Sequence, residues 1–355
     1  MKILSMYLPG FHRNETNDKA WGKGFTEWNN VKKAQKLFKN HQPATPLNGN
    51  YYELTDPNVF KWQSDLAKKY SVDGFVFYHY WFGNGKMELY KPVEIYRKEL
   101  KDKTDYCFCW ANHSWVKNWH DADSRCIVEQ QYFDEKDWIS HINYFIEYFK
   151  DENYIKIDGR PLLYMYDMSS CDCFDEMLKV WNRELNNKGF KDLYVCELIS
   201  SKNRKQNSEM SDAVVEFEPL YTTYFDVSKF NLIKRLFCKL TKRTDFQNYD
   251  KLWKKNIKRT RVYGSKHIQK GCFVNWDNSP RRGRNSTIVK GGTPEKFYNN
   301  LKKLIEHKRE NCDNDFIVIN AWNEWGEGAV LEPTEKDKYA YLEAIKRIKD
   351  EYAAK

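Results

Sequence analysis

Phe316-Ile-Val-Ile-Asn-Ala-Trp-Asn-Glu-Trp-Gly-Glu-Gly-Ala-Val-Leu-Glu-Pro333 joins an apolar run to a dense group of polar and aromatic residues. The apolar run, Phe316–Ile319, is rich in β-branched residues, which indicates a buried β-strand. Carboxylates, amides and indoles follow the strand directly. This order predicts that the strand delivers polar groups to one end of a β-sheet, where they would form a site.

Glu324 and Glu327 stand three residues apart in this stretch. On a tight helical turn their side chains would lie on one side, about 5–6 Å apart at Cβ. Two carboxylates that close raise each other's proton affinity, which yields one acid and one base at neutral pH. Tryptophans beside such a pair are typical of sugar-processing sites. The alternative is two solvated glutamates at a helix start, where the helix dipole favours acidic residues.

Eight short apolar runs along the chain indicate β-strands: Ile3–Tyr7, Val72–Tyr78, Tyr106–Trp110, Pro161–Tyr166, Leu193–Ile199, Ala213–Phe217, Cys272–Trp276 and Phe316–Ala321. Helical patterns lie between most of them and after the last: Asn58–Tyr70, Asp137–Phe149, Phe174–Asn187, Pro294–His307 and Lys338–Tyr352. This alternation implies an α/β fold with parallel strands, and eight repeats imply a closed (β/α)8 TIM barrel. A doubly wound open sheet is disfavoured because no Gly-x-Gly-x-x-Gly follows any strand.

Long irregular segments follow the first, third, sixth and seventh strands: Leu8–Asp56, Ala111–Glu135, Glu218–His267 and Asp277–Thr293. Each lies on the carboxyl side of its strand, where barrel enzymes keep their sites, so we expect a walled substrate cleft there. No repeat or low-complexity linker demands a second domain. We therefore expect one barrel domain over residues 1–355.

The predicted strand ends and the loops after them carry many polar and aromatic residues, and their coincidence at one end of the barrel favours a binding site. We expect several of Trp28, Trp81, Trp110, Trp115, Trp276 and Trp322 to line one cleft with Tyr7 and His79. The alternative is that these side chains pack in the hydrophobic core. The candidate substrate-binding residues are Tyr7, His12, Trp28, His79, Tyr80, Trp81, Trp110, Asn112, His113, Glu216, Trp276, Asp277, Arg281, Arg282, Asn320, Trp322 and Asn323.

The composition of the 355 residues restricts location and partners. No segment approaches the length of a bilayer span, and Lys2–Tyr7 begins a strand rather than a secretory signal. Nine cysteines are an odd number without disulfide-framework spacing, which predicts a reduced, cytoplasmic protein. The net charge of +9 is a moderate excess that is weak evidence for an anionic partner.

Other chemistries have weaker support. His113 and His120 lie in a Trp-rich loop without a matching cysteine pair, and no His-Glu-x-x-His occurs, so we predict no metal and no cofactor. Arg281-Arg-Gly-Arg284 would suit phosphate or nucleic acid, but such arginines are usually solvated or paired with acids. We predict no nucleic-acid partner; on a glycan the arginines would suit a uronic acid or a phosphate.

Phe230–Arg243 has the pattern of a basic amphipathic helix. Its apolar residues share one helical face, and five basic residues surround that face. The pattern favours a surface helix that packs its apolar face on the barrel. Weak contact with the inner membrane surface is the alternative, and it would make the protein peripheral to that membrane.

Several strings, in order along nearly the whole chain, resemble the WbsX-like family, whose barrel is related to glycoside hydrolase family 99. They are Tyr7-Leu-Pro-Gly-Phe-His12, Trp21-Gly-Lys-Gly-Phe-Thr-Glu-Trp-Asn29, Asp73-Gly-Phe-Val-Phe-Tyr-His-Tyr-Trp-Phe82, Cys109-Trp-Ala-Asn112, Asp158-Gly-Arg-Pro161, Val215-Glu-Phe217, Asn275-Trp-Asp-Asn-Ser-Pro-Arg-Arg-Gly283 and Asn320-Ala-Trp-Asn-Glu-Trp-Gly-Glu-Gly328.

The family 99 resemblance implies a retaining, endo-acting α-mannosidase-like enzyme with its two catalytic glutamates at Glu324 and Glu327. It implies that the first takes a proton from the sugar 2-hydroxyl, which attacks the anomeric carbon to give a 1,2-anhydro sugar. The second would act as acid and then as base. One departure is Ala111-Asn-His113, where the family pattern has Ala-Asn-Glu, so that His113 would replace an active-site acid.

The sequence thus predicts a cytoplasmic carbohydrate-active enzyme. The leading hypothesis is a retaining glycoside hydrolase or transglycosylase that acts on a bacterial surface polysaccharide or O-antigen-type glycan. A glycosyltransferase that builds such a glycan is the first alternative, and a catalytically silent glycan-binding barrel is the second. The glycosyltransferase ranks second because the candidate Asp-x-Asp metal–nucleotide motif, Asp121-Ala-Asp123, lies on the Trp-rich loop.

Overall fold

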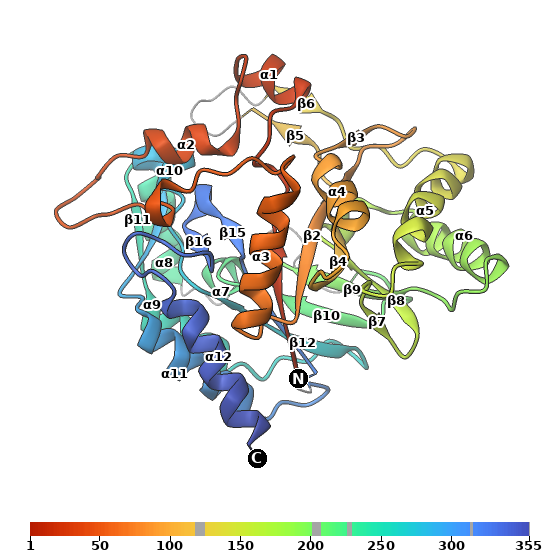
Figure 1. Ribbon diagram of the computed structural model, residues 1–355. Helices are drawn as coiled ribbons and strands as arrows, with labels where there is room; N and C mark the ends of the chain where they lie inside the picture. Colours follow the sequence, from red (N-terminus) through yellow and green to blue (C-terminus); the bar gives the residue numbers. More distant parts are fainter. Residues whose placement is uncertain (118–124, 201–206, 226–228, 313–314, 355) are drawn as a thin grey trace.

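The computed structural model describes residues 1–117, 125–200, 207–225, 229–312 and 315–354, without the side chains of residues 229 and 230 (Figure 1). Trp119, His120 and the Asp121-Ala-Asp123 sequence lie outside the described residues. None of the helices in the described ranges combines the length and apolarity that a membrane span requires.

Eight parallel strands form a closed barrel. They are β1 (Lys2–Tyr7), β2 (Gly74–Trp81), β4 (Asp105–Trp110), β8 (Arg160–Met165), β9 (Tyr194–Ile199), β10 (Ala213–Glu216), β12 (His267–Phe273) and β14 (Phe316–Asn320). Each pairs in parallel with the next in this order, and β14 pairs with β1 to close the ring. The predicted TIM barrel is confirmed.

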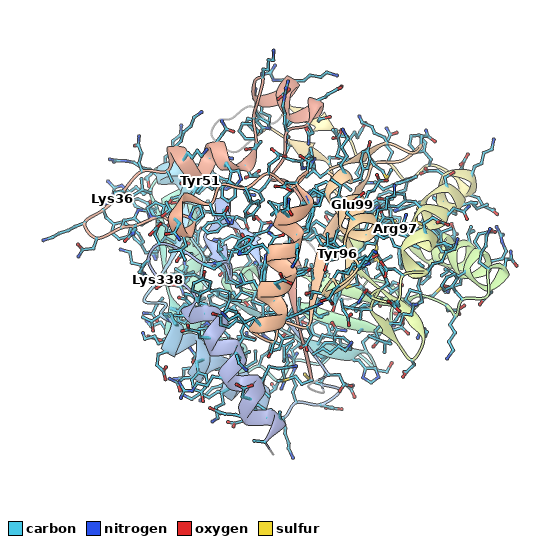
Figure 2. The ribbon with its side chains drawn as sticks, viewed as in Figure 1. Lys36, Tyr51, Tyr96, Arg97, Glu99 and Lys338 are labelled. Atoms are coloured by element: carbon cyan, nitrogen blue, oxygen red, sulfur yellow. The ribbon has the colours of Figure 1, made fainter. Side chains whose placement is uncertain are left out.

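Helices surround the barrel (Figure 1): α3 (Pro57–Lys69), α4 (Lys91–Glu99), α5 (Glu135–Phe149), α6 (Phe174–Asn187), α9 (Tyr249–Ile257), α11 (Pro294–Glu306) and α12 (Ala340–Ala353). The described residues between β9 and β10 contain no helix. Tyr96 of α4 shows how the layers join, because its ring packs on Phe75 and Phe77 of β2 (Figure 2). Its hydroxyl donates to the Thr104 carbonyl oxygen at 2.5 Å, so the buried phenol is satisfied.

The connections carry the remaining elements. Those after β1 and β2 are α1 (Glu15–Trp21), α2 (Glu27–Lys33), η1 (Leu47–Gly49) and β3 (Met87–Glu88); those after β4 and β8 are β5 (Trp115–Val116), β6 (Cys126–Val128), β7 (Lys156–Ile157) and η2 (Met168–Ser170). Those after β10, β12 and β14 are α7 (Leu220–Tyr224), α8 (Lys229–Leu240), β11 (Asp245–Asn248), α10 (Ser279–Arg282), η3 (Gly283–Asn285), β13 (Thr287–Lys290), β15 (Asn323–Glu324), η4 (Trp325–Glu327) and β16 (Ala329–Val330). Most of them lie on the carboxyl side of the barrel strands, as predicted.

The strand that the sequence placed least well is β12. We expected Cys272–Trp276, but the strand is His267–Phe273. Its first half carries polar side chains that hide the pattern. The Lys270 ammonium is buried and donates to the Leu304 and His307 carbonyl oxygens, both at 2.8 Å. These bonds offset the cost of burying a charge, so a strand forms where hydropathy alone predicts a loop.

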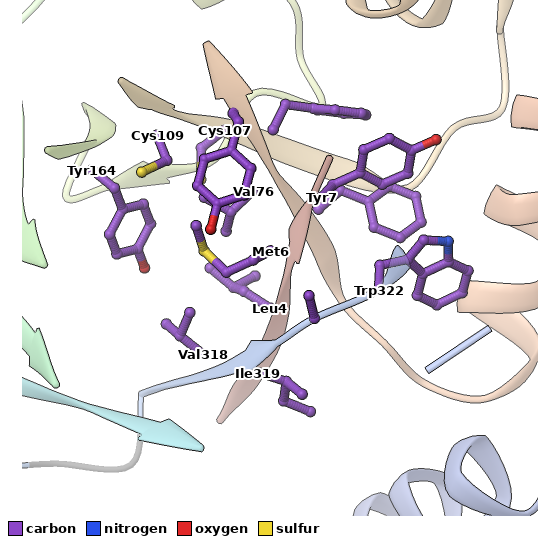
Figure 3. Packing of buried hydrophobic residues seen from close by; sticks show 14 of the residues in the cluster. Leu4, Met6, Tyr7, Val76, Cys107, Cys109, Tyr164, Val318, Ile319 and Trp322 are labelled. Carbon is purple, nitrogen blue, oxygen red and sulfur yellow. The ribbon is translucent and has the colours of Figure 1, made fainter. Parts of the chain in front are cut away.

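Strand side chains alternate between the barrel interior and the helix layer. Leu4 and Met6 of β1 lie inside with Val76, whereas Tyr7 and Trp322 lie on the other side of β1 (Figure 3). The Tyr7 hydroxyl donates to Gln63 of α3 at 2.7 Å. This period of two decides which residues at the strand ends can reach the barrel mouth.

Gly271 of β12 offers a stability test. A Cβ at this position would stand 1.8 Å from the Glu216 carbonyl oxygen of neighbouring β10. The Gly271 backbone and the Glu216 carbonyl are both packed in the sheet and cannot move apart easily. Gly271→Ala should therefore destabilise the fold by about 3 kcal/mol or more. Urea unfolding followed by circular dichroism measures this change. Gly10→Ala is the control, because its Cβ would meet only ordinary contacts from 3.4 Å outward. Equal stability of the two variants would contradict the packing described for β10 and β12.

Candidate active site

A cavity of about 360 Å³ lies over the carboxyl ends of the barrel strands. Residues at or just after the strands form its floor: Leu8, Tyr78, Tyr80, Ala111, Tyr166 and Phe217. The longer connections supply its walls, among them Trp21, Glu27, His113, Trp115, Leu220, Arg281, Arg282, Glu324 and Glu327. The cavity therefore collects side chains from nearly all the long loops at one end of the barrel.

Arg281 is the centre of this cavity's polar wall. Its Nη1 lies 2.8 Å from Glu327 Oε1, and its Nη2 lies 3.1 Å from Glu324 Oε2. A third carboxylate, Glu27 at the start of α2, has its Oε2 at 3.2 Å from the same guanidinium. One positive charge thus organises three carboxylates, two from the connection after β14 and one from the connection after β1.

The catalytic candidates lie on a short turn between two strands. β15 pairs antiparallel with β16, and η4 joins them. Gly326 is required at the middle of this turn, because a Cβ there would stand 2.5 Å from Arg281 Nε. The close approach of the guanidinium to the turn backbone is what lets one arginine reach both Glu324 and Glu327.

Electrostatics separate the two glutamates. Burial raises the pKa of Glu324 to about 8; Arg281 opposes this shift, whereas the Glu327 and Glu27 carboxylates add to it. The side chain of Glu324 is 8% exposed and that of Glu327 is 26% exposed. Because the two side chains interact, the raised pKa means that the Glu324–Glu327 pair holds one proton at neutral pH, and Glu327 is the side chain more open to a ligand.

Aromatic rings line the cavity beside the glutamates. The Trp115 ring stands 5.1 Å from that of Tyr80 at 76°, and the His113 ring lies 5.1 Å from that of Tyr166. Burial and the nearby Glu324 carboxylate both raise the pKa of Tyr80. The phenol therefore stays neutral and can donate a hydrogen bond. Flat faces with polar tips of this kind suit the apolar faces and hydroxyls of a sugar ring.

Six of the predicted site residues line this one cavity: Tyr80, His113, Arg281, Arg282, Glu324 and Glu327. Others point into the helix layer, contrary to our expectation of an aromatic cleft. His79 Nε2 lies 2.9 Å from His141 Nε2 of α5, and Trp81 stacks on the His141 ring at 4.4 Å. Because side chains alternate along β2, Tyr78 and Tyr80 face the mouth, and His79 and Trp81 cannot.

The remaining tryptophans named in that expectation, apart from Trp115, are also core residues. Trp28, Trp110, Trp276 and Trp322 are at most 5% exposed, and none lines the cavity. Tyr7 packs against α3 in the same way. His12 is buried as well, and burial lowers its pKa to about 4. The expectation that these rings form the cleft with Tyr7 and His79 is wrong, because core packing uses their large apolar area.

Three predicted amides tie the strand ends together from within. Asn112 donates to the Asp167 carbonyl oxygen at 2.7 Å and accepts from the Asp167 N–H at 2.8 Å. Asn323 holds Leu8 through a matching pair of bonds at 3.0 and 2.8 Å. Asn320 donates to the Glu218 carbonyl oxygen at 3.0 Å. All three are buried, so they support the mouth of the barrel and do not line the cavity.

Two predicted acidic residues also make structural contacts. Glu216 is buried between Arg259, at 2.6 Å, and Arg309, at 2.8 Å. Asp277 lies behind the turn that carries Glu324 and Glu327, where its N–H donates to the Glu327 carbonyl oxygen at 2.6 Å. His41 Nδ1 accepts from the Leu37 N–H, so its Nε2 carries the proton that it shares with Asp277 at 2.7 Å. His41 and Asp277 thus hold the turn, beside a separate cavity of about 200 Å³.

Sequence reasoning missed several residues of the site. Glu27, Tyr78 and Tyr166 line the cavity. The period of two along β2 identifies Tyr78 once Tyr80 is placed, but nothing in the sequence brings Glu27 to Arg281. Glu332 was missed as well. Its buried carboxylate accepts hydrogen bonds from four side chains behind the turn: Gln63 at 2.6 Å, Tyr52 at 2.8 Å, Trp322 at 3.1 Å and Trp325 at 2.7 Å.

Comparison with known families matches residues 3–345 to a model described as Glycosyltransferase WbsX. The chain belongs to the WbsX family. Two curated relatives, both named uncharacterized protein WxcX, come from two strains of Xanthomonas campestris pv. campestris. Each is 29% identical over 350 residues, which is 97% of this chain and 49% of the relative. This WbsX-family chain therefore spans about half the length of the curated relatives it matches.

Solved structures resemble this WbsX-family chain in fold. A GH99 endo-alpha-mannosidase from Bacteriodes thetaiotaomicron, in complex with BIS-TRIS-Propane, has a TM-score of 0.57 at 16% identity, covering 99% of this chain and 97% of that one. A glycoside hydrolase-like protein has a TM-score of 0.59 at 14% identity, covering 98% and 93%. The predicted membership of the WbsX family is confirmed, and the predicted relation to the family 99 barrel is confirmed for the fold.

The raised pKa of Glu324 predicts how stability depends on pH. A carboxyl whose pKa is raised by folding stabilises the protein below its ordinary pKa, and this contribution is lost as pH rises through about 8. Between about pH 5 and pH 9 the free energy of unfolding should therefore fall more for the unmodified protein than for Glu324→Gln. The difference between the two losses should be about 1–3 kcal/mol. Urea unfolding at each pH measures the difference. Glu343→Gln, at an exposed position on α12, is the control, and parallel pH curves for all three proteins would contradict the assignment.

Proposed function

We propose that the protein is a retaining glycoside hydrolase or transglycosylase that acts on a bacterial surface polysaccharide or O-antigen-type glycan. The observation that carries the proposal is the pair Glu324 and Glu327, which one arginine holds on a single turn at the barrel mouth. Acid–base catalysis needs two carboxyl groups in different protonation states within reach of one bond. The cavity and its aromatic walls supply room for a sugar.

The arrangement favours attack by the substrate's own 2-hydroxyl. A direct carboxylate nucleophile must approach the sugar face opposite the leaving group, which is difficult for two residues on one turn. The proposed first step begins with the pair's one proton on Glu327. Glu324 removes the 2-hydroxyl proton, O2 bonds to C1, and the bond from C1 to the leaving oxygen breaks. Glu327 gives its proton to that oxygen. The products are a 1,2-anhydro sugar and the released chain, which an endo-acting enzyme on α-mannoside-like linkages would yield.

The second step reverses the proton movements. Glu327, now a carboxylate, removes a proton from water or from an acceptor sugar hydroxyl, whose oxygen bonds to C1. The bond from C1 to O2 breaks, and O2 recovers its proton from Glu324. Both inversions occur at C1, so its configuration is retained. Water as acceptor gives hydrolysis, and a sugar hydroxyl gives transglycosylation.

A glycosyltransferase remains the second candidate because the family's description uses that word. It would build the glycan from an activated donor, whereas the proposed enzyme cleaves or transfers finished chains. A catalytically silent glycan-binding barrel would do neither. Incubation with nucleotide sugars and, separately, with finished oligosaccharides distinguishes the three by their products. Conversion of nucleotide sugars alone would overturn the proposed hydrolase.

The proposed function also implies a domain organisation, a set of partners and a cellular location. We propose one catalytic domain over residues 1–355, with a glycan substrate, no cofactor and no nucleic-acid partner. We also propose a cytoplasmic location with peripheral contact at the inner membrane through residues 230–243.

Glu324→Gln and Glu327→Gln should each lower turnover by about 10²-fold or more with a small change in KM, because acid–base assistance acts in the transition state. The double variant should be no slower than the slower single variant. Assays on oligosaccharides released from bacterial surface glycans measure this, with Glu343→Gln as control. Near-full activity of either single variant would contradict the assignment.

The pH profile tests whether the pair must hold one proton. The first step needs Glu324 ionised and Glu327 protonated, so the pair must carry a single proton. The raised pKa of about 8 at Glu324 marks the loss of that proton from the pair, so turnover should fall as pH rises through about 8. Turnover that keeps rising above this pH would contradict the role of the pair as acid and base.

Arg282 provides a test of substrate charge. Arg281 is occupied by its three glutamates, but Arg282 lines the same cavity, and in the described part of the chain no hydrogen bond or ion pair engages its guanidinium. We propose that it meets a carboxylate or phosphate on the substrate. Arg282→Gln should lower kcat/KM on an acidic glycan by about tenfold or more and leave a neutral glycan unaffected. Arg284→Gln, exposed on the same loop, is the control; equal losses on both glycans would contradict the proposal.

A further inference from the structure

Helix α8 presents its apolar face to solvent. Leu232, Ile233, Leu236, Phe237 and Leu240 are between 50% and 75% exposed. At 3.6 residues per turn these side chains share one face of the helix. The sequence favoured packing of this face on the barrel, and that expectation is wrong. Five of the nine large apolar side chains that are exposed in the described residues lie on this helix, so they form a patch rather than scattered exposures.

The opposite, polar face of α8 holds it to the protein. Lys234 Nζ donates to the Phe246 carbonyl oxygen at 2.8 Å and lies 3.3 Å from Asp245. Arg235 Nε also lies 3.3 Å from Asp245, and its guanidinium covers the Tyr224 ring at 3.9 Å. Turning the apolar face inward would break these contacts and leave the buried Asp245 carboxylate without its two cations. The orientation is therefore fixed by ion pairs, not by apolar burial.

The charge beside this face has one sign. Lys239, Lys242 and Arg243 are exposed at the carboxyl-terminal end of the helix, next to Phe237 and Leu240. The segment 229–244 contains no Asp or Glu. An exposed apolar face with Lys239, Lys242 and Arg243 beside it complements an anionic surface with an apolar interior. An anionic lipid bilayer has both properties.

We propose that α8 binds an anionic membrane surface, with its five exposed apolar side chains in the interfacial layer and its cations at the lipid headgroups. The position of α8 suits an enzyme that works there. It contacts β11, and β11 pairs with β13, which follows the α10–η3 segment that carries Arg281 and Arg282. The membrane-binding face thus belongs to the same group of insertions as one wall of the cavity. This inference does not depend on the proposed chemistry.

Vesicle flotation with the full chain tests the proposal. The protein should float with vesicles of phosphatidylcholine and phosphatidylglycerol, and much less with phosphatidylcholine alone. Raised salt should weaken the binding because it screens the headgroup charge. Replacing both apolar side chains, Leu236→Gln with Phe237→Gln, should lower the bound fraction at least tenfold, and Lys239→Gln with Lys242→Gln should remove most of the preference for anionic lipid. All four positions are exposed, so thermal unfolding should stay unchanged.

Val262→Gln, at an exposed apolar position away from α8, is the matched control and should bind like the unmodified protein. Failure to float with anionic vesicles at low salt would overturn the proposal, as would equal binding of the Leu236→Gln/Phe237→Gln variant. Light scattering without lipid tests the alternative that a second copy of the chain covers the apolar face of α8. A dimer that the same double substitution abolishes would show that a second copy of the chain, and not lipid, covers this face.

Discussion

The single guanidinium of Arg281 is the constraint on which the candidate site depends. It holds Glu324 and Glu327 on one turn and Glu27 from the first connection. Three carboxylates around one positive charge cannot all ionise in a buried setting, so the cluster keeps a proton at neutral pH. A buried ion pair contributes little net stability by itself, because desolvation offsets the attraction. The cluster therefore contributes little to the stability of the fold, but it keeps an exchangeable proton at the barrel mouth.

The turn that carries the two glutamates is supported from the side away from the cavity. Glu332 receives four hydrogen bonds there, two of them from the indoles of Trp322 and Trp325 on either side of Glu324. Burial raises the pKa of Glu332 to about 7, while its donors lower it. Asn323 meanwhile fixes the turn to Leu8 at the end of β1. The tryptophans of this motif thus serve the site through their N–H groups and their packing, without entering the cavity.

The sequence was sufficient for the barrel because strand and helix patterns are local, repeated and apolar. It also placed Glu324 and Glu327 together, because they are neighbours on one turn. It failed where geometry depends on the direction of a side chain. Tyr80 faces the mouth and Trp81 does not, although both are aromatic residues at one strand end, and only the phase of the alternation distinguishes them. Glu27 could not be found because its partner Arg281 is remote in sequence, and a long-range ion pair leaves no local pattern.

Helix α8 shows the same limit in another form. An amphipathic pattern defines two faces of a helix but not which of them meets the protein. The usual assumption is that the apolar face is buried, because apolar burial normally supplies most of the stabilisation. Here the buried Asp245 carboxylate forms ion pairs with Lys234 and Arg235 on the polar face. The polar face, and not the apolar face, therefore contacts the protein. If the helix turned its apolar face inward, Asp245 would lose both cations, and an unpaired buried carboxylate is costly. The ion pairs that bind the polar face to the protein therefore also leave the apolar face exposed to solvent.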